Sequence, residues 1–282
     1  MTAAPSSSAL LGPAEIRDLA DALALQPTKK LGQNFVVDGN TVRKIVRTAS
    51  LASGEQVVEV GPGLGSLTLG LLEAGARVTA IEIDKRLAEQ LPRTVEAMQP
   101  GAPLEVIAAD ALRVASVPGE PTALVANLPY NVSVPVLLHL LHVVPSLESA
   151  LVMVQAEVGH RLAAAPGSRV YGSPSVKAAW YGRWSIAGTI SRQVFWPVPN
   201  VDSVLVGFRR AELPGTDAER VATFALVDAA FGQRRKMLRQ SLAEVLGGSA
   251  AASAILEAAG VDPTSRGEQL SVGDFLRVAR AR

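Results

Sequence analysis

Four short apolar runs, separated by stretches of helical character, constrain the fold of this chain more than any other feature. They are EQVVEV (55–60), ARVTAIEI (76–83), LEVIAA (104–109) and TALVAN (122–127). Apolar strands that alternate with helices are typical of a mostly parallel sheet covered by helices on both faces. Further strands are predicted at 149–155, 185–194 and 203–209, and helices at 14–25 and 40–50.

The second half of the chain changes character after Arg210. AELPGTDAE reads as a linker, and from about residue 217 the apolar spacing is helical to the end, RRKMLRQSLAEVLG included. We therefore expect three parts. They are a flexible tail over 1–12, an α/β Rossmann-like domain over 13–210 and a small all-helical domain over 217–282.

Composition narrows the range of chemistry. Of the 282 residues 48% are hydrophobic and 19% charged, which is ordinary for a globular protein, and a net charge of +1 is too small to indicate nucleic acid. The lack of cysteine excludes disulfides, thiolate metal sites and thiol nucleophiles, and suits a reducing cytoplasm. The three histidines have no acidic partners at ligand spacing, so no metal site is expected. With neither a secretory signal nor a long apolar run, we expect a soluble cytoplasmic protein without a membrane partner.

The first chemical signal is VVEVGPGLGSLT, a strand that leads through Gly61, Gly63 and Gly65 into a helix. Glycines there allow a tight turn and the close approach of a ligand over the helix N-terminus. A purely structural turn is the alternative, since short glycine motifs are weakly specific. Glu82 and Asp110 strengthen the binding interpretation, because acids at the ends of successive parallel strands converge on one crevice. The sequence therefore predicts a site for a nucleotide-like cofactor, with Glu82 accepting the ribose hydroxyls.

The second signal is Asn127-Leu128-Pro129-Tyr130, after the fourth strand. The exocyclic amine of adenine is a poor nucleophile, so an enzyme must hold acceptors against its protons. The Asn127 side-chain oxygen and a backbone carbonyl before or at Pro129 suit that task, and Tyr130 offers a face for a flipped base. An ordinary Asn-x-Pro turn is the alternative.

Blocks spread over almost the whole chain resemble the ribosomal RNA adenine dimethylases, and within them the KsgA-type enzymes that act on the small subunit. The blocks are 29–38, 59–68, 81–88, 108–112, 127–137, 194–206, 230–242 and 266–275. The resemblance implies a class I methyltransferase that uses S-adenosylmethionine, releases S-adenosylhomocysteine and dimethylates two adjacent adenosines near the 3′ end of the small-subunit RNA. It adds Asn34 and Val36 to Gly61, Gly63, Glu82, Asp110 and Asn127 as cofactor contacts. It also makes Phe195 the second aromatic beside the target adenine, although core packing fits Phe195 equally well.

A cationic run near the C-terminus has two interpretations. Arg234, Arg235, Lys236 and Arg239 lie together without an acid among them. On a helix they would occupy a little more than one turn, where they could neutralise several RNA phosphates with little readout of sequence; an ordinary solvated surface is the alternative. We expect the RNA-binding role, with ribosomal RNA inside a small subunit or its precursor as the partner and the protein acting as a monomer.

Three other functions stand beside the leading interpretation, and the second of them is compatible with it. They are methylation of large-subunit RNA with resistance to macrolide-type antibiotics, a role in subunit assembly with dispensable catalysis, and an oxidoreductase. The Asn-Leu-Pro-Tyr motif and the block at 230–242 favour the small-subunit enzyme over its large-subunit relative. The G-x-G-x-G spacing disfavours a dinucleotide cofactor.

Overall fold

The computed structural model describes residues 10–25, 34–129 and 132–282 of the chain. The chain divides into two compact units, the first made of Met1–Gly159 and Ile186–Phe208 and the second of His160–Ser185 and Arg209–Arg282. The chain thus enters the second unit, returns to the first, and enters the second again. The sequence interpretation placed all of 160–185 in the large domain, and its boundary at 210–217 stays a prediction about independently folding parts.

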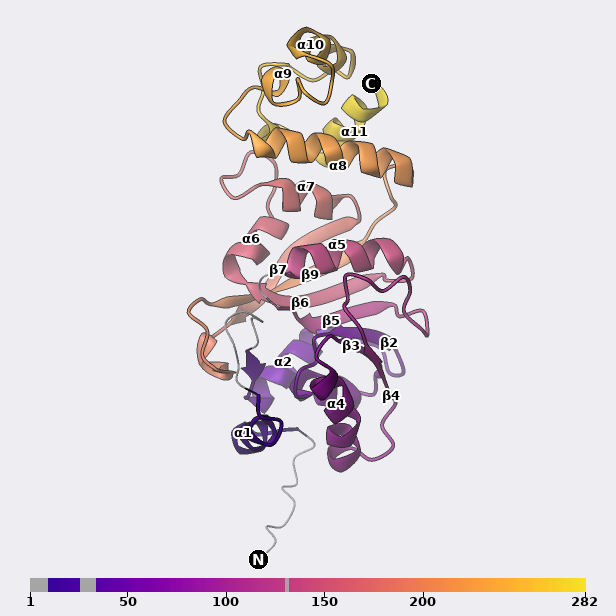
Figure 1. Cartoon of the computed structure of the whole chain (residues 1–282), viewed down its shortest axis with the longest axis vertical. Coiled ribbons are helices and arrows are strands. Elements are labelled where there is room, and N and C mark those ends of the chain that lie inside the picture. Colours follow the sequence, from indigo (N-terminus) through magenta and orange to yellow (C-terminus); the bar gives the residue numbers. More distant parts are fainter. Residues whose placement is uncertain (1–9, 26–33, 130–131) are drawn as a thin grey trace, which may run out of the picture. The chain divides into compact units, whose positions relative to one another are not determined.

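A sheet of seven strands has the order β4-β3-β2-β5-β6-β9-β7 (Figure 1). These strands are β2 (Gln56–Val60), β3 (Arg77–Glu82), β4 (Leu104–Ala108), β5 (Ala123–Asn127), β6 (Ser149–Gln155), β7 (Gly182–Ile190) and β9 (Ser203–Arg210). The pairs from β4 through β6 are parallel, which confirms the predicted α/β fold. Strand β7 ends earlier than the predicted strand at 185–194, because a 3-10 turn, η1 (Arg192–Val194), follows it.

The strand order reverses between β2 and β5. From β2 the chain steps outward through β3 to β4, then crosses back to place β5 on the other side of β2. In open α/β sheets such a switch point opens a crevice at the carboxyl ends of the strands, where ligands bind. The glycine loop follows β2 and Asn127 ends β5, so both predicted motifs lie at this point.

Six helices accompany these strands in the order of the chain. They are α1 (Pro13–Ala22), α2 (Gly39–Ala49), α3 (Ser66–Glu73), α4 (Lys85–Met98), α5 (Ser133–Val143) and α6 (Ala156–Leu162). Asp38 caps α2 by accepting from the Thr41 backbone N–H at 2.8 Å, and Asp84 caps α4 by accepting from the Arg86 N–H at 2.9 Å. These acids satisfy N–H groups that a helix leaves without an internal partner, which explains where both helices begin.

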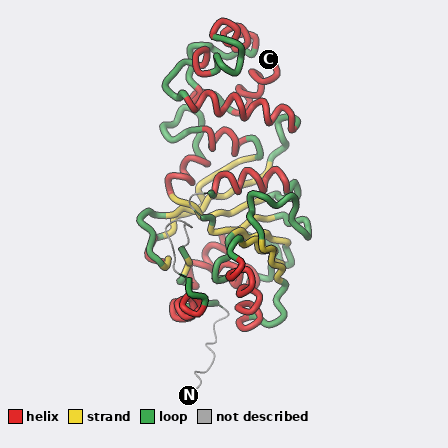
Figure 2. Tube along the Cα trace, in the orientation of Figure 1, coloured by secondary structure: helices red, strands yellow, loops and turns green. Residues whose placement is uncertain are grey.

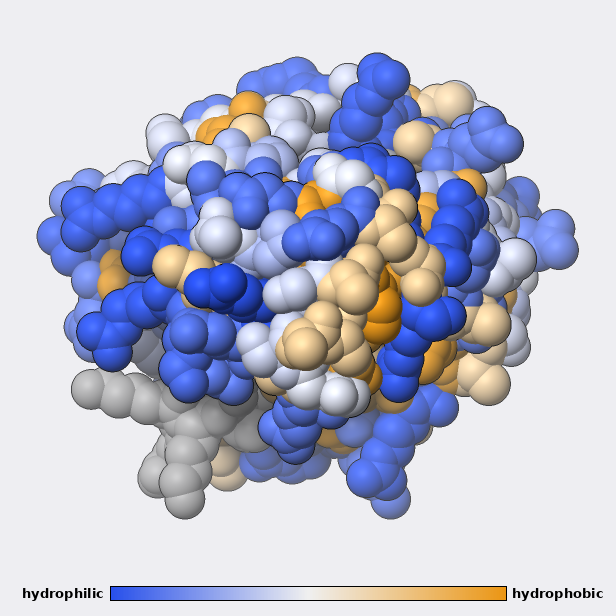
Figure 3. All heavy atoms as spheres, turned by 90° about the horizontal axis from the view of Figure 1, so that it is seen from above, coloured by the Kyte–Doolittle hydropathy of each residue, from blue (hydrophilic) through white to orange (hydrophobic). Residues whose placement is uncertain are grey.

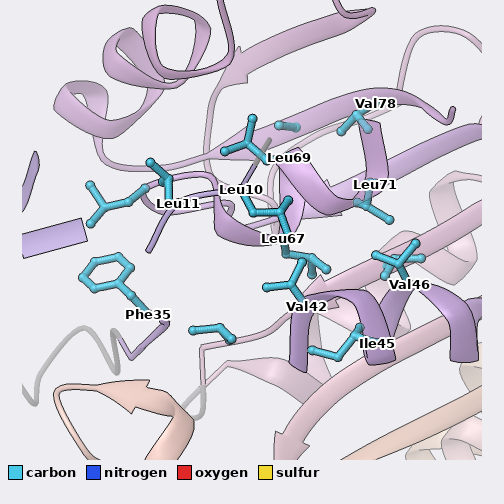
Figure 4. Packing of buried hydrophobic residues seen from close by; sticks show 14 of the residues in the cluster. Leu10, Leu11, Phe35, Val42, Ile45, Val46, Leu67, Leu69, Leu71 and Val78 are labelled. Atoms are coloured by element: carbon cyan, nitrogen blue, oxygen red, sulfur yellow. The ribbon is translucent and has the colours of Figure 1, made fainter. Parts of the chain in front are cut away.

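The core of the first unit gathers side chains from α2, α3 and the strands (Figure 4). Val42, Ile45 and Val46 of α2 are at most 7% exposed. They lie in one cluster with Leu67 and Leu69 of α3. Burial of apolar side chains is the main favourable contribution to folding, so this cluster fixes α3 and with it the glycine loop that precedes it.

A second, two-stranded sheet lies outside the seven-stranded one. In it β1 (Phe35–Val36) pairs antiparallel with β8 (Phe195–Trp196), Phe35 opposite Trp196 and Val36 opposite Phe195. The rings of Phe35 and Trp196 stack with centroids 6.3 Å apart. This pairing anchors the residue before β1, Asn34, from a segment 160 positions further along the chain.

The second unit contains only helices and loops from Asp217 onward (Figure 2). Its helices are α7 (Ser173–Ala179), α8 (Asp217–Gly232), α9 (Leu238–Ser241), α10 (Ser249–Ala258) and α11 (Val272–Arg280), with the 3-10 turn η2 (Gly267–Gln269) before α11. Tyr171 and Val176 share its core with Leu226, Leu256 and Phe275. The face seen from the end that carries α9 and α10 is mainly hydrophilic, with an apolar patch (Figure 3).

The predicted helix over RRKMLRQSLAEVLG is wrong for most of its length. Residues 233–237 form a turn and a bend, and only Leu238–Ser241 is helical. The backbone N–H groups of Leu238 and Arg239 donate to Ser265 and Pro263 carbonyls, at 2.8 and 3.1 Å, instead of to a preceding helical turn. Bonds to a distant segment therefore replace the helix that the local spacing indicated.

Candidate active site

The loop after β2 depends on glycine at each of its three positions. Gly61, Gly63 and Gly65 have φ angles of +66°, +59° and +97°, in the left-handed region that favours glycine. A Cβ on Gly63 would also lie 2.8 Å from Cε1 of Phe35. The loop therefore passes close beneath β1 and brings its backbone N–H groups to the start of α3.

A cavity of about 440 Å³ opens at this loop. The ends of β2, β3 and β5, the segment after β4, and β1 all contribute to its wall. All seven residues predicted to bind the cofactor line it: Asn34, Val36, Gly61, Gly63, Glu82, Asp110 and Asn127. The volume lies within the usual range for small-molecule sites, about 300–1,000 Å³. Residues from widely separated parts of the sequence thus meet in one ligand-sized space.

Glu82 is held firmly at the end of β3. It is 4% exposed. One carboxylate oxygen accepts from the Gly63 N–H at 3.2 Å and the other from the Asp84 N–H at 2.9 Å. Burial raises the pKa of Glu82, while these backbone donors act in the opposite direction. The carboxylate is thereby tied to the glycine loop and keeps further lone pairs for a ligand's hydroxyl groups.

Asp110 follows β4 on the same side of the sheet. Its Oδ1 accepts from the Leu112 N–H at 2.9 Å, and Nε of Arg113 lies 3.6 Å from Oδ2. The side chain is 33% exposed, so it stays accessible from the cavity. Beside it, Ile83 and Leu112 are 66% and 37% exposed and line the same cavity. The sequence analysis overlooked these two apolar side chains, because single exposed apolar residues are common on protein surfaces.

Asn127 has one defined orientation. Its amide nitrogen Nδ2 donates to the backbone carbonyl oxygen of Asn34 at 2.9 Å. Because a carbonyl can only accept, this contact assigns the nitrogen to Asn34 and leaves the Oδ1 oxygen on the other side. The neighbouring Leu128 N–H donates to the Met153 carbonyl at 3.1 Å, and Pro129 lies against Gly61. Leu128 and Pro129 are therefore held by contacts with β6 and with the glycine loop.

Of the two aromatic residues predicted to contact the target base, the structure describes only Phe195. Tyr130 lies outside the described residues. Phe195 is 2% exposed, belongs to the core cluster and is absent from the described lining of the cavity. Phe195 thus lies opposite Val36, one of the predicted cofactor residues, without lining the cavity itself, and its contact with a target base stays a prediction.

Glu59 is a buried acid that sequence reasoning did not include in the site. It lines the cavity, is 1% exposed, and accepts from the Thr68 hydroxyl at 2.6 Å. Burial raises its pKa to about 8, with the nearby charge of Glu82 acting in the same direction. The sequence did contain a signal for Glu59: an acid inside a strand that is expected to be buried on both faces is unusual and indicates a functional role.

The cationic run lies within the second unit, with Arg234, Arg235 and Lys236 in the turn between α8 and α9 and Arg239 in α9. Arg234 is paired there: its Nε lies 2.9 Å from Oε2 of Glu268, and its Nη2 donates to the Arg169 carbonyl at 2.9 Å. Arg235 and Lys236 are exposed. Leu238 and Arg239 bond to the segment at 263–265, next to the exposed Arg266. Backbone contacts thus bring a second segment beside the run, which sequence spacing does not reveal.

The described residues were compared with the requirements of a metal site and of a membrane span. Among them no group of three or more His, Asp or Glu side chains is arranged to hold a metal ion. None of the described helices combines the length and the apolar character needed to cross a membrane.

Fold and site together define a class of protein. A parallel sheet with a glycine loop after β2, acids after β3 and β4 and a cavity at the switch point is the arrangement of a nucleoside-binding Rossmann-like protein. With an amide at the end of β5 and Leu-Pro directly after it, the arrangement is that of the class I S-adenosylmethionine-dependent methyltransferases, in agreement with the solved structures described below.

Comparisons with known proteins identify the family. The family described as ribosomal RNA adenine dimethylase matches residues 24–281. The chain is 70% identical over 273 residues to the ribosomal RNA small subunit methyltransferase A of Leifsonia xyli, covering 96% of this chain and 98% of the relative. It is 59% identical over 286 residues to the protein of the same name from Thermobifida fusca, covering 100% of each. The chain belongs to the ribosomal RNA adenine dimethylase family.

Solved structures agree with this fold. A dimethyladenosine transferase from Plasmodium falciparum is similar with a TM-score of 0.72 at 24% identity, over 86% of this chain and 94% of that one. The 23S rRNA methyltransferase ErmE is similar with a TM-score of 0.64 at 28% identity, over 88% of this chain and 99% of that one. The first of these likenesses concerns the fold alone.

Proposed function

We propose that this chain transfers methyl groups from S-adenosylmethionine to the exocyclic amino groups of adenosines in small-subunit ribosomal RNA. The product is N6,N6-dimethyladenosine at two adjacent positions near the 3′ end of the 16S RNA. The observation that carries the proposal is the fixed amide of Asn127, whose nitrogen is held by Asn34 so that Oδ1 is left to accept from an amine. The 70% identity to a small-subunit methyltransferase supports the choice of RNA.

The cavity fits the proposed cofactor. S-adenosylmethionine supplies an electrophilic methyl group on a cationic sulfur, together with a nucleoside that carries two ribose hydroxyls. In this proposal Glu82 accepts those hydroxyls, and Asp110 and the exposed side chain of Ile83, which line the same cavity, contact the base. The glycine loop gives the backbone room for close approach. Asn34 and Val36 close the cavity from the side of β1.

Asn127 would act on the nucleophile. The adenine amine has its lone pair delocalised into the ring, and two acceptors aimed at its protons favour the geometry in which the lone pair becomes available. The Oδ1 of Asn127 is one acceptor, and the carbonyl of Leu128, held by the bond from Leu128 to Met153, is the second. Transfer then depends mainly on positioning, since the nitrogen must lie in line behind the methyl carbon.

Stacking on aromatic side chains would hold the target base outside the RNA. Tyr130 follows Pro129 directly in the sequence and is the first platform in this proposal. Phe195 remains the second, which requires that its ring become accessible from its buried place in β8. Stacking of one base is worth about 1–3 kcal/mol, comparable to the cost of unstacking a nucleotide.

The second unit would hold the RNA backbone. Arg235, Lys236 and Arg239 are proposed to contact phosphates, and Arg266 extends this group from the neighbouring segment. Arg234 keeps its place in the proposed RNA surface, with its pairing to Glu268 shaping the turn. Phosphate contacts orient the enzyme without reading sequence, so the shape of the subunit would select the target.

The cellular setting is part of the same proposal. We place the protein in the cytoplasm, as a monomer that binds a small ribosomal subunit or its precursor. That the substrate is ribosomal RNA follows from the family. That the RNA is methylated within a small subunit or its precursor is part of the proposal.

Methylation of large-subunit RNA is the second candidate. The 28% identity to a 23S rRNA methyltransferase over 88% of this chain favours it. The higher identity to small-subunit enzymes outweighs it. A role in subunit assembly that does not need catalysis is compatible with the leading proposal.

One experiment separates these candidates. The protein and S-adenosylmethionine are incubated with small subunits that lack the modification, and separately with naked large-subunit RNA, and the digests are analysed for dimethyladenosine by mass spectrometry. We expect product from the small subunit alone, and none with Asn127→Ala. Product from the large-subunit RNA alone would contradict the proposal. Small-subunit binding retained by Asn127→Ala would support the assembly role.

A further inference from the structure

The charged residues that line the cofactor cavity are all acidic. They are Glu59, Glu82, Asp84 and Asp110, and the described lining contains no lysine, arginine or histidine. Asp84 and Asp110 have cations beside them outside the cavity, Arg86 at 2.7 Å and Arg113 at 3.6 Å. Glu59 and Glu82 have no cationic partner among the ion pairs of the described residues. The walls therefore favour a ligand with net positive charge.

Glu59 differs from Glu82 in what holds it. Both oxygens of Glu82 accept backbone N–H groups. The Glu59 carboxyl has one donor, the Thr68 hydroxyl at 2.6 Å on its Oε2. Ser66, which also lines the cavity, is 8% exposed, and its hydroxyl has no hydrogen-bond partner within the described part of the chain. The cavity lining thus holds polar groups whose hydrogen bonds a bound ligand would complete.

The groups that face Glu59 can be named element by element. Strand β3 contributes Glu82, whose charge opposes ionisation of Glu59. Strand β5 (Ala123–Asn127), which pairs with β2 on its other side, contributes no titratable side chain. Helix α3 contributes Thr68, while Glu73 at its far end pairs with Arg43. Without a ligand, burial and the charge of Glu82 keep Glu59 protonated at neutral pH, since its pKa is raised to about 8.

We propose that Glu59 makes the cavity distinguish the cationic cofactor from its product, by releasing its proton to the solvent when the cofactor binds. This inference rests on the proposed function. S-adenosylmethionine carries one more positive charge than S-adenosylhomocysteine, because methyl transfer leaves a neutral thioether in place of the sulfonium. A positive charge in the cavity stabilises the ionised form of Glu59, so binding the cofactor and losing the proton assist each other. The product lacks that charge, so ionisation of Glu59 strengthens the binding of the product less than that of the cofactor. After each transfer the site therefore favours exchange of product for new cofactor.

The test measures binding of the two ligands without RNA. Affinities of S-adenosylmethionine and S-adenosylhomocysteine are determined by calorimetry between pH 6 and 9, for the wild-type chain and Glu59→Gln. Glutamine keeps an oxygen that accepts from Thr68, and circular dichroism checks that the variant folds. In the wild type we expect the preference for the cofactor over the product to rise with pH up to about pH 8. The limit is tenfold for each pH unit, the effect of one proton. In Glu59→Gln the preference should change far less.

Two further variants identify the responsible group. Glu82→Gln should weaken both ligands by a similar factor, since both carry the ribose, and should move the rise in preference to lower pH, since it removes a charge that raises the pKa of Glu59. Thr68→Val removes the donor that lowers the pKa of Glu59, so it should move the rise in preference to higher pH. The amino group common to both ligands titrates in every variant, so comparison between proteins removes its contribution.

The outcomes are distinct. Calorimetry in two buffers of different ionisation enthalpy should show proton release on cofactor binding near pH 7 in the wild type, and less in Glu59→Gln. A preference with the same pH dependence in wild type and Glu59→Gln would overturn the inference while leaving the proposed function intact. Loss of the pH dependence in Glu82→Gln alone would also overturn it. Failure of the wild type to bind S-adenosylmethionine at any pH would contradict the proposed function itself.

Discussion

The hydrogen bond from Asn127 to the Asn34 carbonyl joins two residues 93 positions apart. It requires a side chain with a donor on one side and an acceptor on the other, which among the acidic and amide side chains only the amide provides. The donor fixes the side chain, and the acceptor is then free to meet the substrate. A single contact thus links the position of β1 to the chemistry proposed at the end of β5.

Asn127→Asp tests this link with almost no change in size. Aspartate would face the Asn34 carbonyl with a second acceptor, so the bond would be replaced by repulsion. We expect the rate of methyl transfer at saturating cofactor to fall by about 100-fold or more, in line with losses for other preorganised polar groups. Initial rates and cofactor affinity are measured together. Asn127→Asp with wild-type rates would show that the orientation of the amide does not matter.

Glu59 also connects pH to stability. Its pKa in the folded chain, about 8, lies above the ordinary value of 4.5, so the folded state binds this proton more tightly than the unfolded chain does. Below pH 4.5 both states hold the proton and the full stability is present. Between pH 4.5 and 8 only the unfolded chain has released it, so the free energy of unfolding falls as pH rises, by at most about 1.4 kcal/mol per pH unit.

Urea denaturation of wild type and Glu59→Gln at several pH values measures this effect. We expect the stability of the wild type relative to the variant to decrease from pH 5 to 8 and then level off. Groups with lowered pKa values, such as Asp38 and Asp84, lose their contribution at acid pH in both proteins and cancel in the difference. Parallel pH profiles for the two proteins would show that Glu59 is not titrating in this range.

At the scale of elements, α2 and α3 approach each other at a glycine. A Cβ on Gly70 of α3 would lie 2.3 Å from Cγ1 of Val42 and 3.3 Å from Cγ2 of Val46 on α2. Both valines are buried. Close packing of this kind leaves no space for an added methyl group unless one helix moves.

Gly70→Ala should therefore destabilise the protein although alanine favours helices. The propensity gain is about 1 kcal/mol and overpacking costs about 1–3 kcal/mol, so we expect a net loss of about 1 kcal/mol in chemical denaturation. Val42→Ala in the same chain removes the contacting methyl groups. The double variant should then lose less stability than the sum of the two single variants. Strict additivity would contradict the contact.

Elements of the α/β sheet were predictable from sequence because each is local. The bounds of the runs at 55–60, 76–83 and 122–127 agree with strands β2, β3 and β5 to within two residues. The acid Glu82 and the amide Asn127 at the ends of β3 and β5 could therefore be located from the sequence as well. Contacts between distant segments were not predictable. Neither the pairing of β1 with β8, which buries Phe195, nor the bonds that turn residues 233–237 away from a helix leaves a trace in local spacing.

At the scale of the whole molecule, binding of RNA is expected to depend on salt through the second unit. Arg235→Ala with Lys236→Ala should reduce the slope of log affinity against log salt concentration by about 1–2 for small-subunit RNA, one for each lost phosphate contact. Arg234→Ala should weaken RNA binding too, and should in addition lower the melting temperature, because it removes the pairing with Glu268.

Arg282 provides a matched control for charge. Arg280 bonds to Glu219 and to the Pro214 carbonyl, at 2.7 and 3.3 Å, which places the C-terminus near the start of α8. The 16 residues of α8 separate that end from the cationic turn by roughly 24 Å. Arg282→Ala should leave the salt slope unchanged. An unchanged slope in the double variant as well would make the turn an ordinary solvated surface.

The return of the chain through the second unit bears on how the protein can be made or divided. Tyr171 and Val176 are built into a core whose other members begin only at Leu226. During synthesis these residues leave the ribosome about fifty positions before their partners, and the first unit waits for β8 and β9 to complete it. No single cleavage separates the two units, since a cut after Arg210 would strand residues 160–185 without the helices that cover them. A truncation at any one position therefore removes part of at least one unit, and neither unit can be exchanged as a single continuous segment.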